Sequence, residues 1–400
     1  MHPPGADTVV IRHGEIGTKS EQVRRKMEAR LRDNVAAILA DRGIPGEVVR
    51  ERTRLYVHTD PGAVGAAAEA AADAFGVVST SPAVTVPPEE AAITDALAAA
   101  AREHYDGGSF AVRARRAGDA DAHPFTSEDL ETAGGNAIWE AAEAAGYEPR
   151  VDLEAPDHTL FVECRPEEAF VFCERLEGPG GLPVGTQEPL VALVSGGIDS
   201  PVAAWEAMRR GAPVVPLYVD LGEYGGADHR QRAVATVRGL ARFAPHLDLA
   251  LRVAPGGEAV DRLVEEMDAR RMLGLRRFMY RVAARVAGEH RAVGVVTGEA
   301  IGQKSSQTTA NLGVASAVTD LPIHRPLLAR DKPDITEQAR AIGTYEDATV
   351  AAGCNRVAPS FPETNATLAA VRAAEPADIE ALAEAAAAGV EAVPGPATPE

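Results

Sequence analysis

The strongest chemical signal in this chain of 400 residues is a run of small polar residues, Ser195-Gly196-Gly197-Ile198-Asp199-Ser200. Glycines let the backbone turn so that successive N–H groups point at one anion. The serine hydroxyls can donate further hydrogen bonds, and the Asp199 carboxylate can hold Mg²⁺ beside phosphate oxygens. The run therefore predicts a phosphate-binding loop; the simpler alternative is a tight turn that uses glycine for its geometry.

The elements predicted around this loop would position it well. An apolar strand, 190–194, precedes it, and the helix predicted over 201–210 begins with a proline, which is tolerated at that position. The N-terminus of a helix attracts negative charge. The loop matches neither the nucleoside-triphosphatase motif nor the dinucleotide fingerprint. Ser-Gly-Gly-x-Asp-Ser instead resembles the pyrophosphate loop of ATP pyrophosphatases, which adenylate a substrate oxygen and release pyrophosphate.

Further apolar runs indicate the fold around the loop. Four buried runs separated by helices are typical of a doubly wound parallel sheet; they cover residues 190–194, 214–219, 249–253 and 293–297. Before them, a Gly/Pro-rich hinge at 178–185 is the clearest boundary in the chain.

Two smaller units are predicted before the hinge. The first is an α+β unit with a strand over 8–12, a helix over 19–42 and an alternating strand over 47–59. The second is an α/β unit, in which Thr126 and Asp129 fit a helix capping box. The expected domains are 1–60, 61–177, a linker over 178–186, and 187–360. An acidic C-terminal tail over 361–400 is expected to form a helix and a frayed end.

Several stretches around the loop narrow the family. They are 176–187 (LEGPGGLPVGTQ), 201–205 (PVAAW), 296–308 (VTGEAIGQKSSQT), 325–332 (RPLLARDK) and Cys354. Together they resemble the ThiI family of tRNA 4-thiouridine synthases, in the form without a rhodanese domain, over about residues 8–360. The resemblance implies an N-terminal ferredoxin-like α+β domain, a THUMP α/β domain that binds tRNA, and a C-terminal ATP pyrophosphatase (PP-loop) domain.

The resemblance also implies a reaction. ATP adenylates O4 of uridine 8 in tRNA, and sulfur then attacks C4 and displaces AMP, so that 4-thiouridine forms. ATP and Mg²⁺ are the implied cofactors. Two alternatives remain open at this point: a sulfurtransferase that serves thiazole synthesis for thiamine, and a tRNA-binding protein without catalysis.

Residue roles follow from the match to the family's motifs. Asp199 is expected to hold Mg²⁺, and Lys332 to stabilise charge as pyrophosphate leaves. The resemblance assigns ATP binding to Leu193, Val194, Ser195, Gly196, Gly197, Ser200, Tyr218, Val219, Arg276, Gly298 and Gln307. For Arg276 the alternative is a solvated face or RNA-binding ridge of an arginine-rich helix, and for Gln307 it is a turn cap.

Sulfur delivery is expected to involve Cys354, which follows Gly353 and precedes Asn355-Arg356. An inert loop cysteine is the alternative. Cys164 and Cys173 lie in apolar surroundings and are predicted to be buried small hydrophobes. We therefore expect no intrachain iron–sulfur cluster, which needs three or four thiolates. The sulfur donor would be sulfide or a persulfide-carrying protein, and the resemblance implies a homodimer.

Two rows of arginines are candidates for tRNA phosphate contacts. One is Arg113, Arg115 and Arg116 in an alternating strand. The other is Arg50, Arg52 and Arg54, which would project from the face of a strand opposite to Val49, Leu55 and Val57. A solvated surface is the alternative for each row.

Composition sets the remaining limits. The net charge is −19, of which residues 61–180 contribute −16, and four of the 40 cationic residues are lysines. This balance indicates adaptation to a salty cytoplasm, with a GC-rich genome as the alternative, so global charge is a poor guide to partners. Three cysteines are too few for a disulfide framework. No apolar run reaches a membrane span, and no signal pattern opens the chain, so we expect a soluble, cytoplasmic protein.

Overall fold

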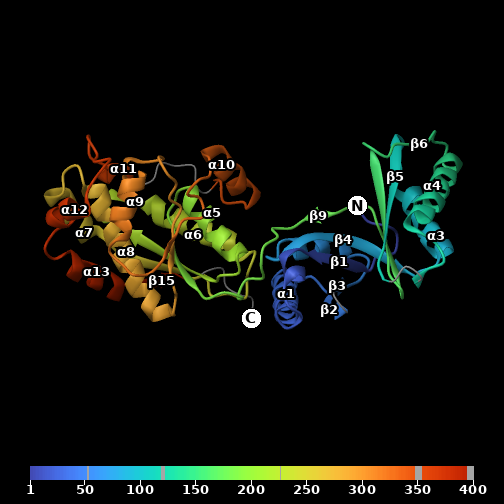
Figure 1. Ribbon diagram of the computed structural model, residues 1–400, viewed down its shortest axis with the longest axis horizontal. Helices are drawn as coiled ribbons and strands as arrows, with labels where there is room; N and C mark the ends of the chain where they lie inside the picture. The colour runs from blue at the N-terminus through green and yellow to red at the C-terminus, as the bar shows by residue number, and fades with distance from the viewer. Residues whose placement is uncertain (52–53, 119–121, 226, 347–353, 394–400) are drawn as a thin grey trace. The chain divides into compact units, whose positions relative to one another are not determined.

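In the part of the chain that the computed structural model describes, residues 1–51, 54–118, 122–225, 227–346 and 354–393, two compact units form. They are Met1–Gly181 and Leu182–Glu400, and each contains its own sheet and cores (Figure 1). The predicted hinge over 178–185 spans the boundary between them. Each unit is described by itself below.

The first unit contains one mixed sheet with the strand order β2-β3-β1-β4-β8-β7-β5-β6, and β9 pairs with part of β4. The long strand β4 joins the two halves of this sheet because it pairs with β1 and with β8. The strands are β1 (Thr8–His13), β2 (Glu47–Glu51), β3 (Arg54–His58), β4 (Val77–Val86), β5 (Ser109–Arg116), β6 (Arg150–Val151), β7 (His158–Cys164), β8 (Ala169–Phe172) and β9 (Leu176–Glu177).

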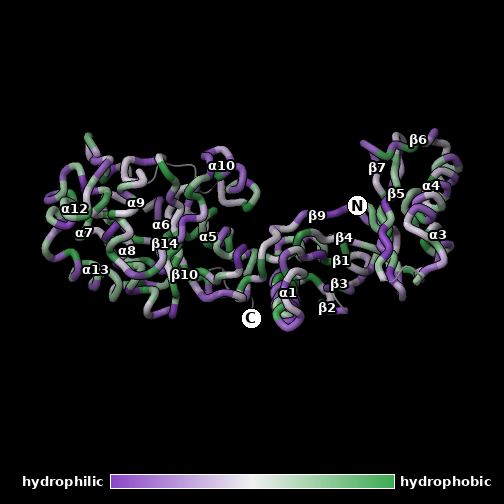
Figure 2. The backbone as a smooth tube through the Cα atoms, in the orientation of Figure 1, coloured by the Kyte–Doolittle hydropathy of each residue, from purple (hydrophilic) through white to green (hydrophobic). Residues whose placement is uncertain are grey.

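The described helices of this unit pack on one face of the sheet. The helices α1 (Glu21–Asp41) and α2 (Val64–Ala72) cover β1, β3 and the start of β4. The helices α3 (Glu90–His104) and α4 (Ser127–Ala144) cover β5, β7 and β8. Hydrophobic and hydrophilic residues mix along α1, as expected for a helix with one buried side (Figure 2). The opposite face carries an aromatic cluster, which includes Tyr56, Phe170 and Phe172.

The capping box predicted for α4 is confirmed. The Thr126 hydroxyl accepts a hydrogen bond from the Asp129 N–H at 3.1 Å, and the Asp129 carboxylate accepts one from the Thr126 N–H at 2.8 Å. This reciprocal pair satisfies N–H groups that the first turn of a helix leaves without an intrahelical partner.

The single strand predicted over 47–59 is wrong. The structure forms β2 and β3 there, paired antiparallel with Val49 opposite Tyr56 and Glu51 opposite Arg54. The alternation of apolar residues continues through the reversal of the chain, and for that reason the pattern resembled one long strand. The reversal changes which face each side chain occupies.

The second unit contains a sheet with the strand order β14-β13-β10-β11-β12-β15, parallel except for β15. The predicted doubly wound parallel sheet is thus confirmed. The helices α5 and α6 contact β11 on one face, while α7, α8 and α13 pack on the other through Val191, Leu217 and Val219.

The strands are β10 (Leu190–Leu193), β11 (Val214–Asp220), β12 (Leu251–Pro255), β13 (Val295–Val296), β14 (Ile323–His324) and β15 (Glu391–Val393). The helices are α5 (Asp199–Arg209), α6 (Ala227–Ala241), α7 (Gly257–Glu266), α8 (Arg271–His290), α9 (Thr309–Ser316), α10 (Lys332–Ala341), α11 (Cys354–Val357), α12 (Leu368–Ala374) and α13 (Ile379–Ala388). Short 3-10 turns are η1 (Glu15–Thr18) in the first unit, and η3 (Gly222–Tyr224) and η4 (Ser305–Gln307) in the second.

The segment expected to be an acidic tail contributes ordered structure to the second unit. The helix α13 packs against α8, and β15 adds an antiparallel strand beside β12. Glu375, after α12, accepts hydrogen bonds from Arg277 and Arg281 of α8. In this segment some of the acidic side chains are therefore ion-pair partners of a buried helix. Among the helices described here, none is long and apolar enough to span a membrane.

Candidate functional site

A cavity of about 260 Å³ lies at the carboxyl ends of β10 and β11, beside the start of α5. In the sheet, β10 has β11 on one side and β13 on the other, so the chain order changes direction here. Ligands of open α/β sheets bind at such a switch point. All residues expected to bind ATP line this cavity: Leu193, Val194, Ser195, Gly196, Gly197, Ser200, Tyr218, Val219, Arg276, Gly298 and Gln307.

The loop between β10 and α5 is held by its own two serines. The Ser195 N–H donates to the Ser200 hydroxyl at 2.8 Å, and the two hydroxyl oxygens lie 3.1 Å apart. The Gly197 N–H donates to the Ser195 hydroxyl at 3.3 Å. Helix α5 begins at Asp199 with no side-chain cap on its first turn. Its N-terminal N–H groups therefore suit an anionic ligand.

A close approach of two backbone segments explains the glycine at position 298. A Cβ atom added to Gly298 would lie 2.6 Å from the carbonyl carbon of Asp199 and 2.8 Å from the Ser200 nitrogen. Backbone atoms cannot yield as a flexible side chain can. Gly298 thus lets the segment after β13 contact the first residues of α5, and any side chain there would displace the loop.

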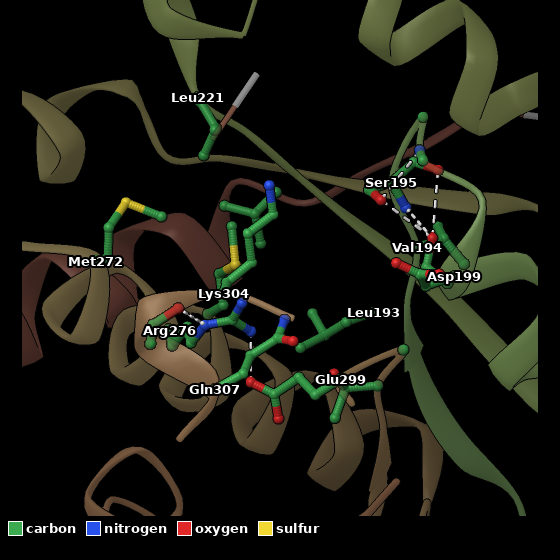
Figure 3. Close-up of a pocket in the computed structure, with 18 of the residues that line it drawn as sticks. Leu193, Val194, Ser195, Asp199, Leu221, Met272, Arg276, Glu299, Lys304 and Gln307 are labelled. Atoms are coloured by element: carbon green, nitrogen blue, oxygen red, sulfur yellow. Dashed lines mark hydrogen bonds and ion pairs between the residues drawn. The ribbon is translucent and has the colours of Figure 1, made fainter. Parts of the chain in front are cut away.

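Arg276 of α8 enters the cavity from the side opposite to the loop, next to Glu299 and Gln307 (Figure 3). Its Nε donates to the Ser306 hydroxyl at 2.8 Å, and its Nη1 donates to Oε1 of Glu299. With the Gln307 amide oriented to satisfy both of its neighbours, its oxygen accepts from Arg276 Nη2 at 2.9 Å. The side chains around the guanidinium therefore hold it in place at the cavity wall.

Glu299 was given no role by the sequence, yet it is the centre of this wall. Its Oε2 accepts hydrogen bonds from the Tyr280 hydroxyl at 2.5 Å and from Arg325 Nε at 2.7 Å. Burial alone would raise the pKa of Glu299, but the charges of Arg276 and Arg325 outweigh it and leave the pKa below its ordinary value. The carboxylate therefore stays ionised inside the protein and pairs with both arginines, so the three groups together keep one positive charge.

Sequence reasoning also missed other side chains of the cavity wall: Tyr280, Met272, Met279, Leu221, His229 and Lys304. Tyr280 follows Arg276 by one turn of α8, and this helical spacing was a signal that could have found it. Lys304 lies in the same short stretch as Gly298 and Gln307, as one of four lysines in the chain. Burial and the nearby Arg232 and Arg356 lower the pKa of His229.

Lys332 and Asp199 form an ion pair, with the Lys332 Nζ 2.6 Å from Oδ1 of Asp199. Each residue begins a helix, α10 and α5 respectively. Asp199 also lines the cavity. Within the described ranges, no group of three or more His, Cys, Asp or Glu side chains is arranged to hold a metal ion. A metal here would depend on Asp199 together with oxygens of a ligand.

The predicted burial is confirmed for Cys164, whereas Cys173 is partly buried. Cys164 is fully buried in the core beneath α3 and α4, and Cys173 packs against the same core. Burial raises the pKa of the Cys164 thiol to about 11 and that of Cys173 to about 12. The side chain of Cys354 lies outside what the structure describes. Its backbone begins α11, one helical turn before Ala358, which lines the cavity.

The arginine row expected at 50, 52 and 54 is wrong as a single surface. Arg50 is opposite Leu55 in the β2–β3 pair and bonds to the buried Glu28 of α1, on the helix-covered face. Arg54 is opposite Glu51 and pairs with Glu163 of β7, on the other face. Arg52 lies outside the described residues. The chain reversal between β2 and β3 is the physical reason.

The second arginine row lies on β5 as predicted. Arg115 is exposed, and Arg113 donates to the Leu153 carbonyl. They project from one face because strand side chains alternate, and Arg116 projects from the other.

Comparisons with known proteins agree with this arrangement. Residues 185–378 match the model of the family described as Thiamine biosynthesis protein (ThiI), residues 8–81 match the ThiI ferredoxin-like domain, and residues 88–174 match the THUMP domain. A probable tRNA sulfurtransferase of Halobacterium salinarum is 62% identical over 376 residues, which are 94% of this chain and 94% of the relative. One from Methanosarcina acetivorans is 42% identical over 90% of this chain and 87% of its own.

A solved structure is also similar over almost the entire chain. It is a crystal structure of a 4-thiouridine synthetase–RNA complex with bound ATP. Its TM-score is 0.83 at 29% sequence identity, with 97% of this chain and 100% of that chain covered. The similarity thus includes both units.

Proposed function

The chain belongs to the ThiI family of tRNA sulfurtransferases, and from this we propose that it adenylates O4 of uridine 8 in tRNA and replaces that oxygen with sulfur to give 4-thiouridine. The observation that carries the proposal is the cavity at the switch point of the second unit, which every residue expected to bind ATP lines. The similar 4-thiouridine synthetase was solved with ATP and RNA, and this similarity supports the same use of the site.

ATP would lie with its adenosine against Leu193, Val194, Tyr218 and Val219, at the ends of β10 and β11. Its phosphates would contact the loop over 195–200, where backbone N–H groups and the start of α5 favour negative charge. Arg276 faces the loop from across the cavity, held by Glu299 (Figure 3). It would add a fixed positive charge to the ligand's surroundings.

The donor set also fits Mg²⁺, which prefers carboxylate and phosphate oxygens and keeps several waters. Asp199 would hold the ion, which would neutralise phosphate charge when bound. Lys332 orients the Asp199 carboxylate through its hydrogen bond. As a cation at the same end of α5, it would also stabilise charge that develops as pyrophosphate leaves.

Sulfur chemistry would take place next to the same cavity. After adenylation, the bond between C4 and the O4 oxygen breaks, and this oxygen departs with AMP while a sulfur nucleophile forms the new bond to C4. Cys354 is our candidate for a sulfur carrier or resolving thiol, because α11 leads within about one turn to Ala358 at the cavity wall. The donor would be sulfide or a persulfide on another protein.

The remaining parts of the proposal concern partners and setting. The tRNA would bind through the first unit, which matches the ferredoxin-like and THUMP models. We propose a cytoplasmic homodimer, as the family resemblance implies. A role in thiazole synthesis is a second candidate, favoured by the description of the matched family as a thiamine biosynthesis protein.

The test is thiolation of a defined RNA. The purified chain is incubated with unmodified tRNA transcript, Mg-ATP and sulfide at high salt, and 4-thiouridine is read from its absorbance. Asp199→Ala should abolish the product. Loss with Cys354→Ser as well would make Cys354 a participant, and retention would mean that sulfide attacks the adenylated base directly. A wild-type chain that forms neither 4-thiouridine nor AMP would overturn the proposal.

A further inference from the structure

The face of the first unit that its described helices leave open carries a dense group of arginines. Three of them surround one buried carboxylate, Glu163 of β7. Arg165 Nη2 lies 2.8 Å from Oε1 of Glu163, Arg54 Nη2 lies 3.1 Å from the same oxygen, and Arg12 Nη2 lies 3.3 Å from Oε2. We call these residues, together with Arg175, the Glu163 cluster. It joins β1 and β3 to β7 and to the chain on either side of β8.

Charge in this cluster does not balance. One carboxylate faces three guanidinium groups whose side chains are between 13% and 20% exposed. Burial, with the neighbouring Arg175 and Arg54, lowers the pKa of Arg12 to about 10 even though Glu163 opposes the shift. Glu168 is a further acid near Arg165, and its pKa is raised by burial and by the charge of Glu51. Such a surplus of partly buried positive charge lowers the stability of the fold unless a bound anion neutralises it.

Aromatic rings fix the directions of two of these arginines. The rings of Phe161 and Phe172 stack with centroids 5.1 Å apart. The Arg175 guanidinium lies 4.4 Å from the Phe161 centroid, and that of Arg12 lies 4.8 Å from the Phe172 centroid. Arg12 is oriented further by donating to the Ser81 hydroxyl at 2.9 Å. A guanidinium that stacks on a ring through its face keeps the N–H groups at its edge available. These in-plane donors match the spacing of two phosphate oxygens.

We propose that the Glu163 cluster binds phosphate groups of the RNA backbone, with Arg175 and Arg12 as the contacting residues and Glu163 as the positioning residue. This inference rests on the proposed function, since the RNA is the tRNA substrate. Arg54, from the row expected at 50, 52 and 54, belongs to this cluster, whereas Arg50 lies on the helix-covered face. Partly buried charges are screened less by salt than exposed ones. We therefore expect Arg12, whose side chain is 15% exposed, to keep its RNA contact at salt concentrations that weaken contacts of the exposed Arg175.

The experiment measures binding of unmodified tRNA transcript by the full chain over a series of KCl concentrations. Arg175→Gln removes an exposed side chain that stacks on rings, so the fold should survive. We expect a Kd raised about tenfold, the scale of one charge-assisted hydrogen bond. The slope of log K against log salt should fall by about one, as for one lost phosphate contact. Arg12→Gln should act in the same direction, and Arg175→Lys should keep the slope.

Matched controls are Arg25→Gln and Arg32→Gln on α1, which change charge equally on exposed side chains of the helix-covered face. Thermal unfolding of each variant reports the fold. The proposal would be overturned if Arg175→Gln and Arg12→Gln bind tRNA with the affinity and salt slope of these controls. In that case the proposed function would still stand if both variants make 4-thiouridine. Failure of the wild-type chain to bind tRNA at any salt would overturn both.

Discussion

The ammonium group of Lys332 lies 2.6 Å from the Asp199 carboxylate, although 133 residues separate them in the chain. Both residues are the first of their helices, so the pair brings the starts of α10 and α5 together. A lysine at a helix N-terminus is unfavourable by itself, because the helix dipole repels it. The contact with Asp199 offsets this repulsion and presents a cation at the edge of the phosphate loop.

We therefore expect Lys332→Ala to slow the adenylation of tRNA by about 100-fold or more, the scale for removing one charge-stabilising group from an active site. Lys332→Arg should retain part of the rate, because the charge remains but its shape changes. Single-turnover release of pyrophosphate from ATP labelled at its γ-phosphate measures the step. Lys26→Ala, on the exposed side of α1, is the matched control. Equal rates for the wild type and Lys332→Ala would remove Lys332 from the reaction.

Glu299 is expected to control the position of Arg276 without touching ATP. In Glu299→Gln, Arg276 and Arg325 lose the carboxylate with which both are paired, so the Arg276 guanidinium should leave its place at the cavity wall. We expect the Kd for ATP to rise about tenfold, with a smaller rise for Tyr280→Phe, which removes one hydrogen bond to Glu299. Calorimetric titration with ATP measures both.

Glu265→Gln on α7 is the control for Glu299→Gln, since it removes the same charge from an exposed position. Stability also needs checking, because a buried network is disturbed. If Glu299→Gln unfolds more easily but binds ATP as tightly as the control, the network serves the fold alone.

Local and distant features of the site differ in how far the sequence could predict them. The phosphate loop is contiguous in the chain, so the order of its glycines and serines was enough to predict an anion site. Arg276, Gly298 and Gln307 were assigned by family resemblance. The Glu299 network has no such signature, because Tyr280, Glu299 and Arg325 meet only after α8 packs beside β13 and β14. Its assembly depends on the tertiary fold.

The same limit explains the expectations that differ from the structure. Alternation over 47–59 correctly indicated extended chain, but periodicity carries no information about a reversal between two strands of similar pattern. For the C-terminal segment, the sequence predicted a helix and a frayed end but no partners for its acidic side chains. Glu375 instead pairs with Arg277, whose side chain is 1% exposed. Nothing in the composition of residues 361–400 could identify that partner about 100 positions earlier.

The pairing of Glu375 gives a prediction for stability. Glu375→Gln leaves Arg277 buried without its carboxylate, so we expect the free energy of unfolding of the second unit to fall by about 3 kcal/mol. Glu384→Gln, exposed on α13, should change it little. Urea unfolding at pH 7 measures the difference. A midpoint equal to that of Glu384→Gln would show that α12 and α13 contribute nothing through this pair.

The pH dependence of the same pair has a definite sign. Burial opposes ionisation of Glu375, but hydrogen bonds from Arg277 and Arg281 hold its pKa below the ordinary value. A depressed carboxylate pKa gives stability that is present above the pKa of the unfolded chain, near 4.3, and is lost as the pH falls through the lower folded value. The advantage of the wild type over Glu375→Gln should therefore shrink below about pH 5. An advantage that stays constant down to pH 3 would contradict this.

Thiol reactivity offers a last test, one that separates the cysteines. Burial raises the pKa of Cys164 to about 11, so about one thiol in a thousand is ionised at pH 8. The pKa of Cys173, raised to about 12, makes its thiolate scarcer still. Iodoacetamide should therefore label both slowly in the native protein and rapidly in urea, as read by peptide mass spectrometry. If Cys354 is the sulfur carrier, it should label fastest in the native chain, and bound ATP should slow it because α11 adjoins the cavity wall at Ala358. Labelling of Cys354 as slow as that of Cys164 would argue against a carrier role.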